Sequence, residues 1–493
     1  MSTVKVEKLN EAKSRLHCSD FGITQEVNDY FTFTVKGHQF MPAFKRGQWD
    51  GKIRLFDAMR GLIPNGLLQM TEDFCKARSY EYEAEDDRKE YPLDEDFIKS
   101  IPLRGGKGEE IEFRDYQYAA VKNAIDKHRS ILLSPTASGK SLMIYLLIRH
   151  FIYSFDEDIL LVVPTTSLVD QMKGDFLDYA KADDGFDGES MVHTIMAGAD
   201  KSIKKRITIT TWQSAYKQPK SWFDRFGMVI GDEAHTFKAQ SLVKIMDNLT
   251  NAWHRVGTTG TIPADSKVDK LTLQAHFGSI YKVISTKELI DAGTLANLAI
   301  KTMVIKYPDE QCKLVKAADY KMEIDWLVEN DRRNSFIARL ALSTKGNSLL
   351  LFNFVDKHGI PLFNLLKKLA PNRPIYYVSG KIKTSEREEI RAAVEGHSDA
   401  IIVASFATYS TGINIRNLNN IIFASPTKST IRVLQSIGRG LRKCDRGLKT
   451  TVFDIVDDLC WKKHQNYAFK HGKARANIYA QQRFRTKTFL YSI

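Results

Sequence analysis

The chain has 493 residues, a hydrophobic fraction of 43% and a formal net charge of +13. This length is enough for about three domains of ordinary size. No stretch approaches the ~20 consecutive apolar residues of a membrane span, and the N-terminus lacks the apolar core of a signal peptide, so we expect a cytoplasmic protein with no membrane partner. The five cysteines lack metal-site or Cys-x-x-Cys spacing, which indicates reduced thiols and no structural metal.

Residues 1–105 read as a small α+β domain. Apolar and polar residues alternate along 31–36 and 52–55, which predicts short strands. One candidate surface for nucleic acid lies here. The residues of this candidate surface are Trp49, Lys52 and Arg54. The alternative, equally compatible with the sequence, is a tryptophan packed in the fold beside a solvated basic strand.

A candidate phosphate-binding loop runs from Ser134 to Ser141, with an apolar strand before it and a helix after it. Backbone N–H groups in such a loop can wrap a phosphate chain, and the helix N-terminus adds positive charge. Lys140 would reach the β- and γ-phosphates and Ser141 would ligate Mg²⁺. An ordinary strand–turn–helix is the alternative. The expected ATP contacts are Pro135, Thr136, Ala137, Ser138, Gly139, Lys140 and Ser141.

Two adjacent acids, Asp232 and Glu233, follow the apolar run 226–231, which predicts a buried parallel strand. Ligands of α/β proteins bind at the carboxyl ends of such strands. We expect Asp232 to hold Mg²⁺ through water and Glu233 to activate the attacking water. His235 either couples this site to residues 259–261 or is a structural histidine.

Strands and helices alternate from residue 113 onward, which predicts parallel sheets with helices on both faces. The expected boundaries are 106–298 for a first α/β domain and 299–493 for a second. The predicted strands of the first are 131–133, 159–163, 207–210, 228–231 and 255–257, and those of the second are 348–354, 375–379, 400–405, 420–424 and 451–455.

An arginine pair lies in the second α/β domain, in the segment that Gln435 opens. Arg439 and Arg442 are three residues apart and would share one face of a helix. Two guanidinium groups on one face can stabilise charge on a γ-phosphate in the transition state. A solvated basic helix face is the alternative.

The C-terminal residues 461–493 contain eight Lys/Arg and no acid, interleaved with aromatic residues. This composition suits nucleic-acid contact by charge and stacking. Tyr467, His471, Ala474 and Ile478 also fall at helical spacing, which predicts a terminal helix docked on the second domain with its basic face solvated. We expect both descriptions to hold in part.

The order of these motifs resembles that of the superfamily 2 helicases and translocases. Residues 113–117 are similar to their adenine-reading segment, and this likeness implies that Arg114 and Gln117 contact ATP, although Gln117 could equally cap a helix. It implies a role for Thr259 and Thr261 in linking hydrolysis to strand movement. It further implies nucleic-acid contacts at Pro164, Thr165, Thr166, Thr211, Trp212, Gln213 and Thr411, and nucleotide contacts at Gly412 and Asn414, where Asn414 replaces the more usual Asp.

Nearly the whole chain resembles the phage UvsW-type DNA helicases, notably in residues 46–55, 65–67, 218–223, 307–310 and 377–380. The resemblance implies two tandem RecA-like parallel-sheet domains after a small α+β N-terminal domain. It implies an ATP- and Mg²⁺-dependent helicase that unwinds D-loops and R-loops, migrates Holliday junctions and regresses forks in recombination, replication and repair.

The expected partner is single-stranded and branched DNA, bound with little sequence dependence. The expected protein is a monomer in the cytoplasm, which is that of the host cell if the protein is phage-encoded, with recombination or single-strand-binding proteins as candidate partners. An RNA helicase and a non-catalytic nucleic-acid-binding scaffold stay open as alternatives.

Overall fold

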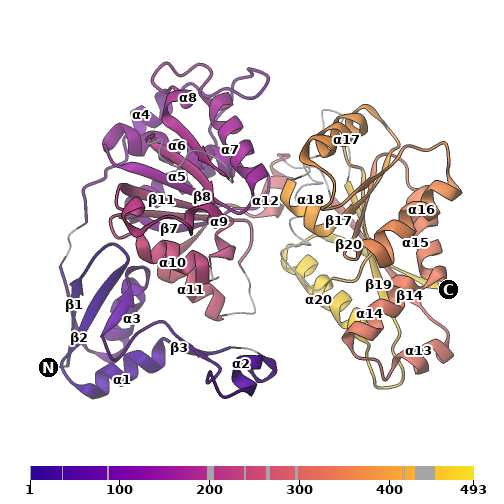
Figure 1. Ribbon diagram of the computed structural model, residues 1–493, viewed down its shortest axis with the longest axis horizontal. Helices are drawn as coiled ribbons and strands as arrows, with labels where there is room; N and C mark the ends of the chain where they lie inside the picture. Colours follow the sequence, from indigo (N-terminus) through magenta and orange to yellow (C-terminus); the bar gives the residue numbers. More distant parts are fainter. Residues whose placement is uncertain are drawn as a thin grey trace. The chain divides into compact units, whose positions relative to one another are not determined.

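The computed structural model describes residues 2–493 except 36, 86–87, 197–204, 238–239, 263–266, 295–297, 413–414, 416 and 428–449, with the backbone alone at 384–385 and 410–412. It divides into two compact units, Met1–Ser134 with Gly139–Val283 and Pro135–Ser138 with Ile284–Ile493. Figure 1 gives the labels of the helices and strands. None of the described helices has the length and apolar composition needed to cross a membrane.

The first unit begins with a small module on a four-stranded sheet in the order β5-β2-β1-β6. Val4 and Val6 alternate with exposed residues along β1 and pack on Ile23 and Val27 of α1, as the period of a half-buried strand requires. The elements are β1 (Thr3–Lys8), β2 (Lys13–Cys18), α1 (Phe21–Tyr30), β3 (Thr32–Thr34), η1 (His38–Phe40), α2 (Pro42–Lys45), β4 (Lys52–Arg54), β5 (Leu62–Pro64), η2 (Asn65–Leu67), α3 (Leu68–Arg78) and β6 (Glu81–Ala84). The predicted small α+β domain is confirmed.

This module packs closely on the α/β part of the same unit. A Cβ on Gly66 would lie 2.1 Å from the carbonyl oxygen of Gln274, so only glycine allows this approach. Ala275 lies in the hydrophobic core of the module. Arg129 donates a hydrogen bond to the carbonyl oxygen of Glu11.

The α/β part of the first unit holds a seven-stranded parallel sheet in the order β13-β7-β12-β11-β8-β10-β9. All five predicted strands are present, and the two edge strands β9 and β13 were not predicted. The strands are β7 (Arg129–Leu133), β8 (Asp158–Val163), β9 (Val192–Ile195), β10 (Ile207–Thr211), β11 (Phe226–Asp232), β12 (His254–Thr259) and β13 (Ser279–Lys282).

Helices cover both faces of this sheet, with α5, α6 and α7 on one side and α9, α10 and α11 on the other (Figure 1). Helix α6 is buried along almost its whole length because it lies against the sheet between two neighbouring helices. The helices of this part are α4 (Glu95–Ser100), α5 (Asp115–Lys127), α6 (Lys140–Ser154), α7 (Thr166–Tyr179), α8 (Gly188–Met191), α9 (Trp212–Ala215), η3 (Lys220–Phe223), η4 (Ala234–Thr236), α10 (Gln240–Asn248) and α11 (Lys267–Phe277).

The second unit holds another seven-stranded parallel sheet, in the order β16-β17-β15-β18-β19-β14-β20. Its five predicted strands are present, whereas β14 and β20 at one side of the sheet were not predicted. The strands are β14 (Leu298–Lys306), β15 (Ser348–Phe352), β16 (Ile375–Val378), β17 (Ile401–Ser405), β18 (Asn420–Phe423), β19 (Thr450–Asp458) and β20 (Arg485–Ser492). The predicted fold class, two parallel-sheet domains after a small module, is confirmed.

One large core cluster joins this second sheet to helices α13 to α16. The described helices of the unit are α12 (Thr286–Asp291), α13 (Asp309–Val315), α14 (Tyr320–Glu329), α15 (Asp331–Ser343), η5 (Val355–Gly359), α16 (Ile360–Leu369), α17 (Thr384–Gly396), α18 (Phe406–Gly412) and α20 (Tyr467–Gln481).

The C-terminal helix α20 packs against β19, as the helical spacing predicted. Lys470 and Lys473 are exposed, but Arg475 is 1% exposed and ion-paired. Arg475 therefore does not belong to the solvated basic face of this helix. Sequence alone shows its charge and not its buried partner.

Candidate ATP-binding site and nucleic-acid surface

The phosphate loop connects β7 to α6 and is shaped by two residues with positive φ, Ala137 at 66° and Gly139 at 83°. A Cβ on Gly139 would lie 2.2 Å from Nε2 of Gln117, so a side chain does not fit there. The Ser138 hydroxyl donates to the carbonyl oxygen of Pro135 at 2.7 Å. Helix α6 has no side-chain cap among the described residues, which leaves its first-turn N–H groups available to an anion.

Lys140 is the first residue of α6, and its Nζ donates to the carbonyl oxygen of Ser134 at 3.3 Å. The next side chain, Ser141, has its Oγ 2.9 Å from the hydroxyl of Tyr179 at the end of α7. No sequence signal pointed to Tyr179. The structure therefore places the predicted phosphate-binding lysine and metal-binding serine together at one helix N-terminus.

Gln117 forms a helix cap in this structure. Its side-chain Oε1 accepts from the backbone N–H of Arg114 at 3.0 Å, and the two residues form a capping box at the start of α5. Gln117 is buried, with its Nε2 facing the backbone of Gly139. Arg114 donates to the hydroxyl of Tyr116 at 3.0 Å. The capping alternative accounts for these contacts, and the adenine contact stays a prediction.

Asp232 ends β11 in a buried position beside the strand β12. The hydroxyl of Thr258 donates to Asp232 Oδ1 at 2.7 Å. Burial raises the pKa of the Asp232 carboxyl above its ordinary value, the neighbouring Glu233 carboxylate adds to that rise, and Lys140 opposes it. A buried carboxylate of this kind is stabilised in its charged form by a cation.

Glu233 adopts a left-handed backbone conformation, with φ at 49°. A non-glycine residue in this region costs about 1–3 kcal/mol and occurs often at functional sites. The conformation ends β11 and starts the short helix η4. It places the carboxylate Oε2 3.2 Å from Nδ1 of His235.

His235 contacts the end of the neighbouring strand, as the coupling hypothesis requires. Its Nδ1 lies 3.0 Å from Oγ1 of Thr259, and the Thr259 hydroxyl donates to the carbonyl oxygen of Thr261 at 2.9 Å. The same Nδ1 lies 3.2 Å from Oε2 of Glu233, so His235 lies between Glu233 and Thr259. The structure thus brings His235 into contact with Thr259, which lies 24 positions further along the chain.

The candidate nucleic-acid motifs of the first unit lie at the carboxyl ends of two neighbouring strands of its sheet. Strands β8 and β10 are parallel neighbours, with Val163 paired to Thr211, so the residues that follow each strand are close together. Thr166 begins α7 and is exposed, as is Gln213 in α9. Pro164 and Thr165 are half-buried, and Trp212 packs partly on the hydrophobic core.

The Trp49 region forms part of a small hairpin. The Trp49 indole N–H donates to the carbonyl oxygen of Lys52 at 2.7 Å, and Arg54 pairs with Asp50 at 2.5 Å. Lys52 and Arg54 are exposed. These contacts fit both a nucleic-acid surface and a packed tryptophan beside a solvated basic strand. Asp50 neutralises part of the positive charge of this surface.

Several predicted residues lie outside the described part of the chain. Gln435, Arg439, Arg442 and Asn414 are among them. Thr411 and Gly412 end helix α18, where only the backbone is described. Their predicted roles stay predictions.

Three family descriptions match successive parts of the chain. Residues 3–85 match the N-terminal domain of the DNA helicase UvsW, and residues 110–264 match the res subunit of type III restriction enzymes. Residues 332–444 match the helicase conserved C-terminal domain.

Full-length relatives agree with these matches. The chain is 34% identical to the ATP-dependent DNA helicase uvsW of Enterobacteria phage T4, over 98% of each protein. It is 26% identical to the DNA 3′-5′ translocase XPB2 of Sulfurisphaera tokodaii, over 87% of this chain and 95% of the relative. The crystal structure of T4 UvsW matches with a TM-score of 0.51 and 32% identity, covering 99% of each chain. The chain belongs to the UvsW family of ATP-dependent DNA helicases.

Proposed function

We propose that this helicase uses ATP hydrolysis to remodel branched DNA during recombination, replication and repair in the cytoplasm of a phage-infected host. The reactions would be unwinding of D-loops and R-loops, branch migration of Holliday junctions and regression of stalled forks. Support comes from the likeness to T4 UvsW over both the N-terminal module and the two α/β units. The chain would act as a monomer, alone or with recombination and single-strand-binding proteins.

The observation that carries the catalytic part of this proposal is the cluster at the carboxyl end of β11. Asp232 ends the strand and Glu233 follows it, and His235 contacts both Glu233 and Thr259. In the proposed hydrolysis of ATP, Lys140 binds the phosphates and Glu233 orients the attacking water. Arg439 and Arg442, in the segment that Gln435 opens, would stabilise the charge that develops on the γ-phosphate.

The residues present suit a divalent cation. Ser141 offers a hydroxyl at the start of α6, and Asp232 offers a buried carboxylate whose pKa is raised by burial and by Glu233. Hard oxygen ligands of this kind are those that Mg²⁺ prefers. The ion, when bound, would neutralise charge on the phosphates.

DNA would be held chiefly through its phosphates. Hydroxyls at Thr166, Thr211 and Thr411 would contact phosphate without reading sequence, although Thr211 is buried and its hydroxyl donates to Ser214. Binding should therefore depend little on sequence and strongly on salt. The exposed Lys52 and Arg54 are weaker candidates for the same task.

The proposal is tested by ATPase activity measured in parallel with single-stranded DNA, duplex DNA, a four-way junction, an R-loop and RNA. We expect single-stranded and branched DNA to stimulate turnover most. Stimulation by RNA alone would instead identify an RNA helicase, and no turnover with any nucleic acid would identify a binding scaffold.

A further inference from the structure

Strand β19 carries two fully buried acids, Asp454 and Asp457, each 0% exposed. They are three positions apart, so their side chains project to opposite faces of the sheet. The odd-numbered neighbours Phe453 and Ile455 lie in the core cluster with helices α13 to α16. Asp457 therefore faces those helices and Asp454 faces the other side.

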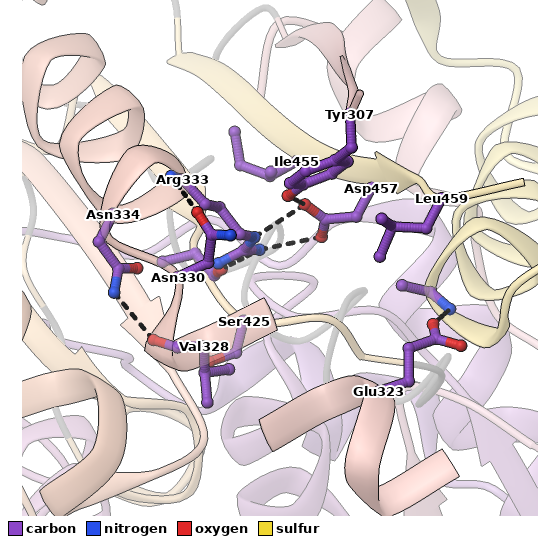
Figure 2. Close-up of polar contacts among 12 residues, drawn as sticks. Tyr307, Glu323, Val328, Asn330, Arg333, Asn334, Ser425, Ile455, Asp457 and Leu459 are labelled. Carbon is purple, nitrogen blue, oxygen red and sulfur yellow. Dashed lines mark hydrogen bonds and ion pairs between the residues drawn. The ribbon is translucent and has the colours of Figure 1, made fainter. Parts of the chain in front are cut away.

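Arg333 of α15 binds Asp457 on the first face. Its Nε donates to Oδ1 at 2.7 Å and its Nη2 donates to Oδ2 at 3.1 Å. Tyr307 donates its hydroxyl to the same carboxylate at 2.7 Å (Figure 2). The same Nη2 also donates to the carbonyl oxygen of Ala424 at 2.8 Å.

Arg475 of α20 binds Asp454 on the second face. Its Nε lies 2.9 and 3.0 Å from the two carboxylate oxygens, and the Tyr479 hydroxyl donates to Oδ2 at 2.9 Å. The Nη1 of Arg475 donates to the carbonyl oxygen of Thr427 at 2.6 Å. This geometry requires a close helix, and Gly472 permits it, since a Cβ there would lie 2.5 Å from Cγ1 of Val456.

The two arginines thus hold both ends of the short segment Ala424–Thr427. Its middle is held as well, because the Ser425 hydroxyl accepts from the backbone N–H of Asn353 at 3.0 Å and lies 2.7 Å from His358 Nδ1. The Asn353 side chain donates to the carbonyl oxygen of Pro426 at 3.2 Å. Each residue of the segment is fixed by at least one side chain or backbone group of the surrounding core.

The position of this segment in the chain gives it a consequence for catalysis. It directly precedes residues 428–449, which contain Arg439 and Arg442, and β19 begins directly after them at Thr450. Asp457 and Asp454, which follow residues 428–449 in the chain, bind Arg333 and Arg475. These arginines in turn donate to the carbonyl oxygens of Ala424 and Thr427, which precede the same residues. Hydrogen bonds on both faces of β19 therefore connect the segments before and after residues 428–449.

We propose that Arg475, with Asp454 and Tyr479, is a positioning residue for ATP hydrolysis, acting through the backbone at Thr427 on the stretch that carries Arg439 and Arg442. Arg333 and Asp457 do the same at Ala424 from the opposite face. This inference rests on the proposed function of Arg439. Stability alone does not require such pairs, because well-packed apolar residues often replace buried ion pairs without loss. A guanidinium can bind a carboxylate and a carbonyl at once, and apolar residues cannot.

Arg475→Lys is the most direct test, because lysine keeps the charge but lacks the planar fork that reaches both Asp454 and Thr427. We expect kcat for DNA-stimulated ATP hydrolysis to fall by about tenfold to a hundredfold, the loss typical of small displacements in an active site. The KM for ATP and the affinity for a fluorescent ATP analogue should stay within about twofold of the wild-type values, because the phosphate loop is unchanged.

Ile478→Ala is the matched control. Ile478 is buried in the same helix but contributes no side-chain hydrogen bond to the Ala424–Thr427 segment. It should lower the melting temperature by at least as much as Arg475→Lys while leaving kcat nearly unchanged at a temperature where both variants are folded. An equal loss of kcat in the two variants would reduce Arg475 to a structural role.

A double variant separates this inference from the proposed function. In an Arg439→Ala background, Arg475→Lys should cause no further loss of kcat, since both act on one transition-state contact. Multiplicative losses, or wild-type kcat in Arg475→Lys alone, would overturn the positioning role. Normal turnover in Arg439→Ala alone would instead refute the proposed role of Arg439, and the positioning role with it.

Discussion

His235 Nδ1 lies 3.0 Å from the hydroxyl oxygen of Thr259, and this contact joins the ends of two neighbouring strands, β11 and β12. Glu233 is on the same side, 3.2 Å from the imidazole. Any movement of Glu233 can therefore reach the backbone at Thr261 through three contacts: Glu233 with His235, His235 with Thr259, and Thr259 with Thr261. The contact offers a physical route from the candidate ATP site to residues 259–261, for which we predict a role in strand movement.

Thr259→Val should uncouple hydrolysis from strand separation. Valine keeps the shape of threonine but removes the hydroxyl that contacts His235 and donates to the carbonyl oxygen of Thr261. We expect DNA-stimulated ATPase activity to stay within about threefold, while unwinding of a forked duplex falls by about tenfold, as a coupling energy of 1–3 kcal/mol implies. Parallel loss of both activities would show that Thr259 serves hydrolysis itself.

Asp232→Asn should abolish hydrolysis and stabilise the fold at alkaline pH. The pKa of Asp232 is raised in the folded protein, mainly by burial and next by Glu233, so the folded state binds a proton that the unfolded state releases. The stability from this proton is fully present below the ordinary carboxyl pKa and is lost as pH rises through the raised value. Asparagine has no such loss and can still accept from Thr258.

Melting temperatures of both proteins, measured in EDTA from pH 5 to pH 9, check this prediction. The advantage of the Asn variant should grow with pH. A constant difference across the range would mean that Asp232 is not destabilised by its charge.

Gly472→Val should displace helix α20 from β19. The new Cβ would lie 2.5 Å from Val456 Cγ1, and a β-branched neighbour cannot move away easily. We expect a loss of about 1–3 kcal/mol in the free energy of unfolding, as for other overpacked cores. Ala476→Val, at an exposed position of the same helix, should change it by less than about 0.5 kcal/mol. Denaturant unfolding compares the two variants, and equal stabilities would show that the helix is not closely packed at Gly472.

Replacing the exposed Lys470 and Lys473 by Gln tests whether α20 binds DNA. Each lost phosphate contact should reduce the slope of log K against log salt by about 0.7–0.9. Affinity for single-stranded DNA, measured at several salt concentrations, gives this slope. An unchanged slope would assign the helix a structural role alone. Point substitutions are preferable to truncation here, because truncation would also remove the buried Arg475.

The sequence predicted the strands that are apolar on both faces, such as β8, because a parallel strand buried between helix layers has a continuous apolar run. It missed β20, whose residues are all exposed and include Arg485 and Lys487. Its basic composition favoured a nucleic-acid tail, and its pairing with β14 depends on residues far away in the chain.

The residues of the candidate ATP site could be proposed from sequence, because the loop at 134–141 and the two acids at the end of β11 are local patterns. The side-chain partners of buried polar residues could not be predicted. Tyr179, which contacts Ser141, is 38 residues away from it, and Asp454, which binds Arg475 in the second unit, is 21 residues away. Such pairs follow from the topology of the sheets rather than from any local spacing.

The most direct test of the central claim is branch migration of a labelled, movable four-way DNA junction by the wild-type protein and by Lys140→Ala and Arg439→Ala. We expect ATP-dependent migration by the wild type only, with junction binding retained by both variants. Arg439→Ala should still bind ATP but lose hydrolysis by about 10³-fold or more, as removal of an arginine finger does. Migration without ATP, or wild-type rates in either variant, would contradict the account.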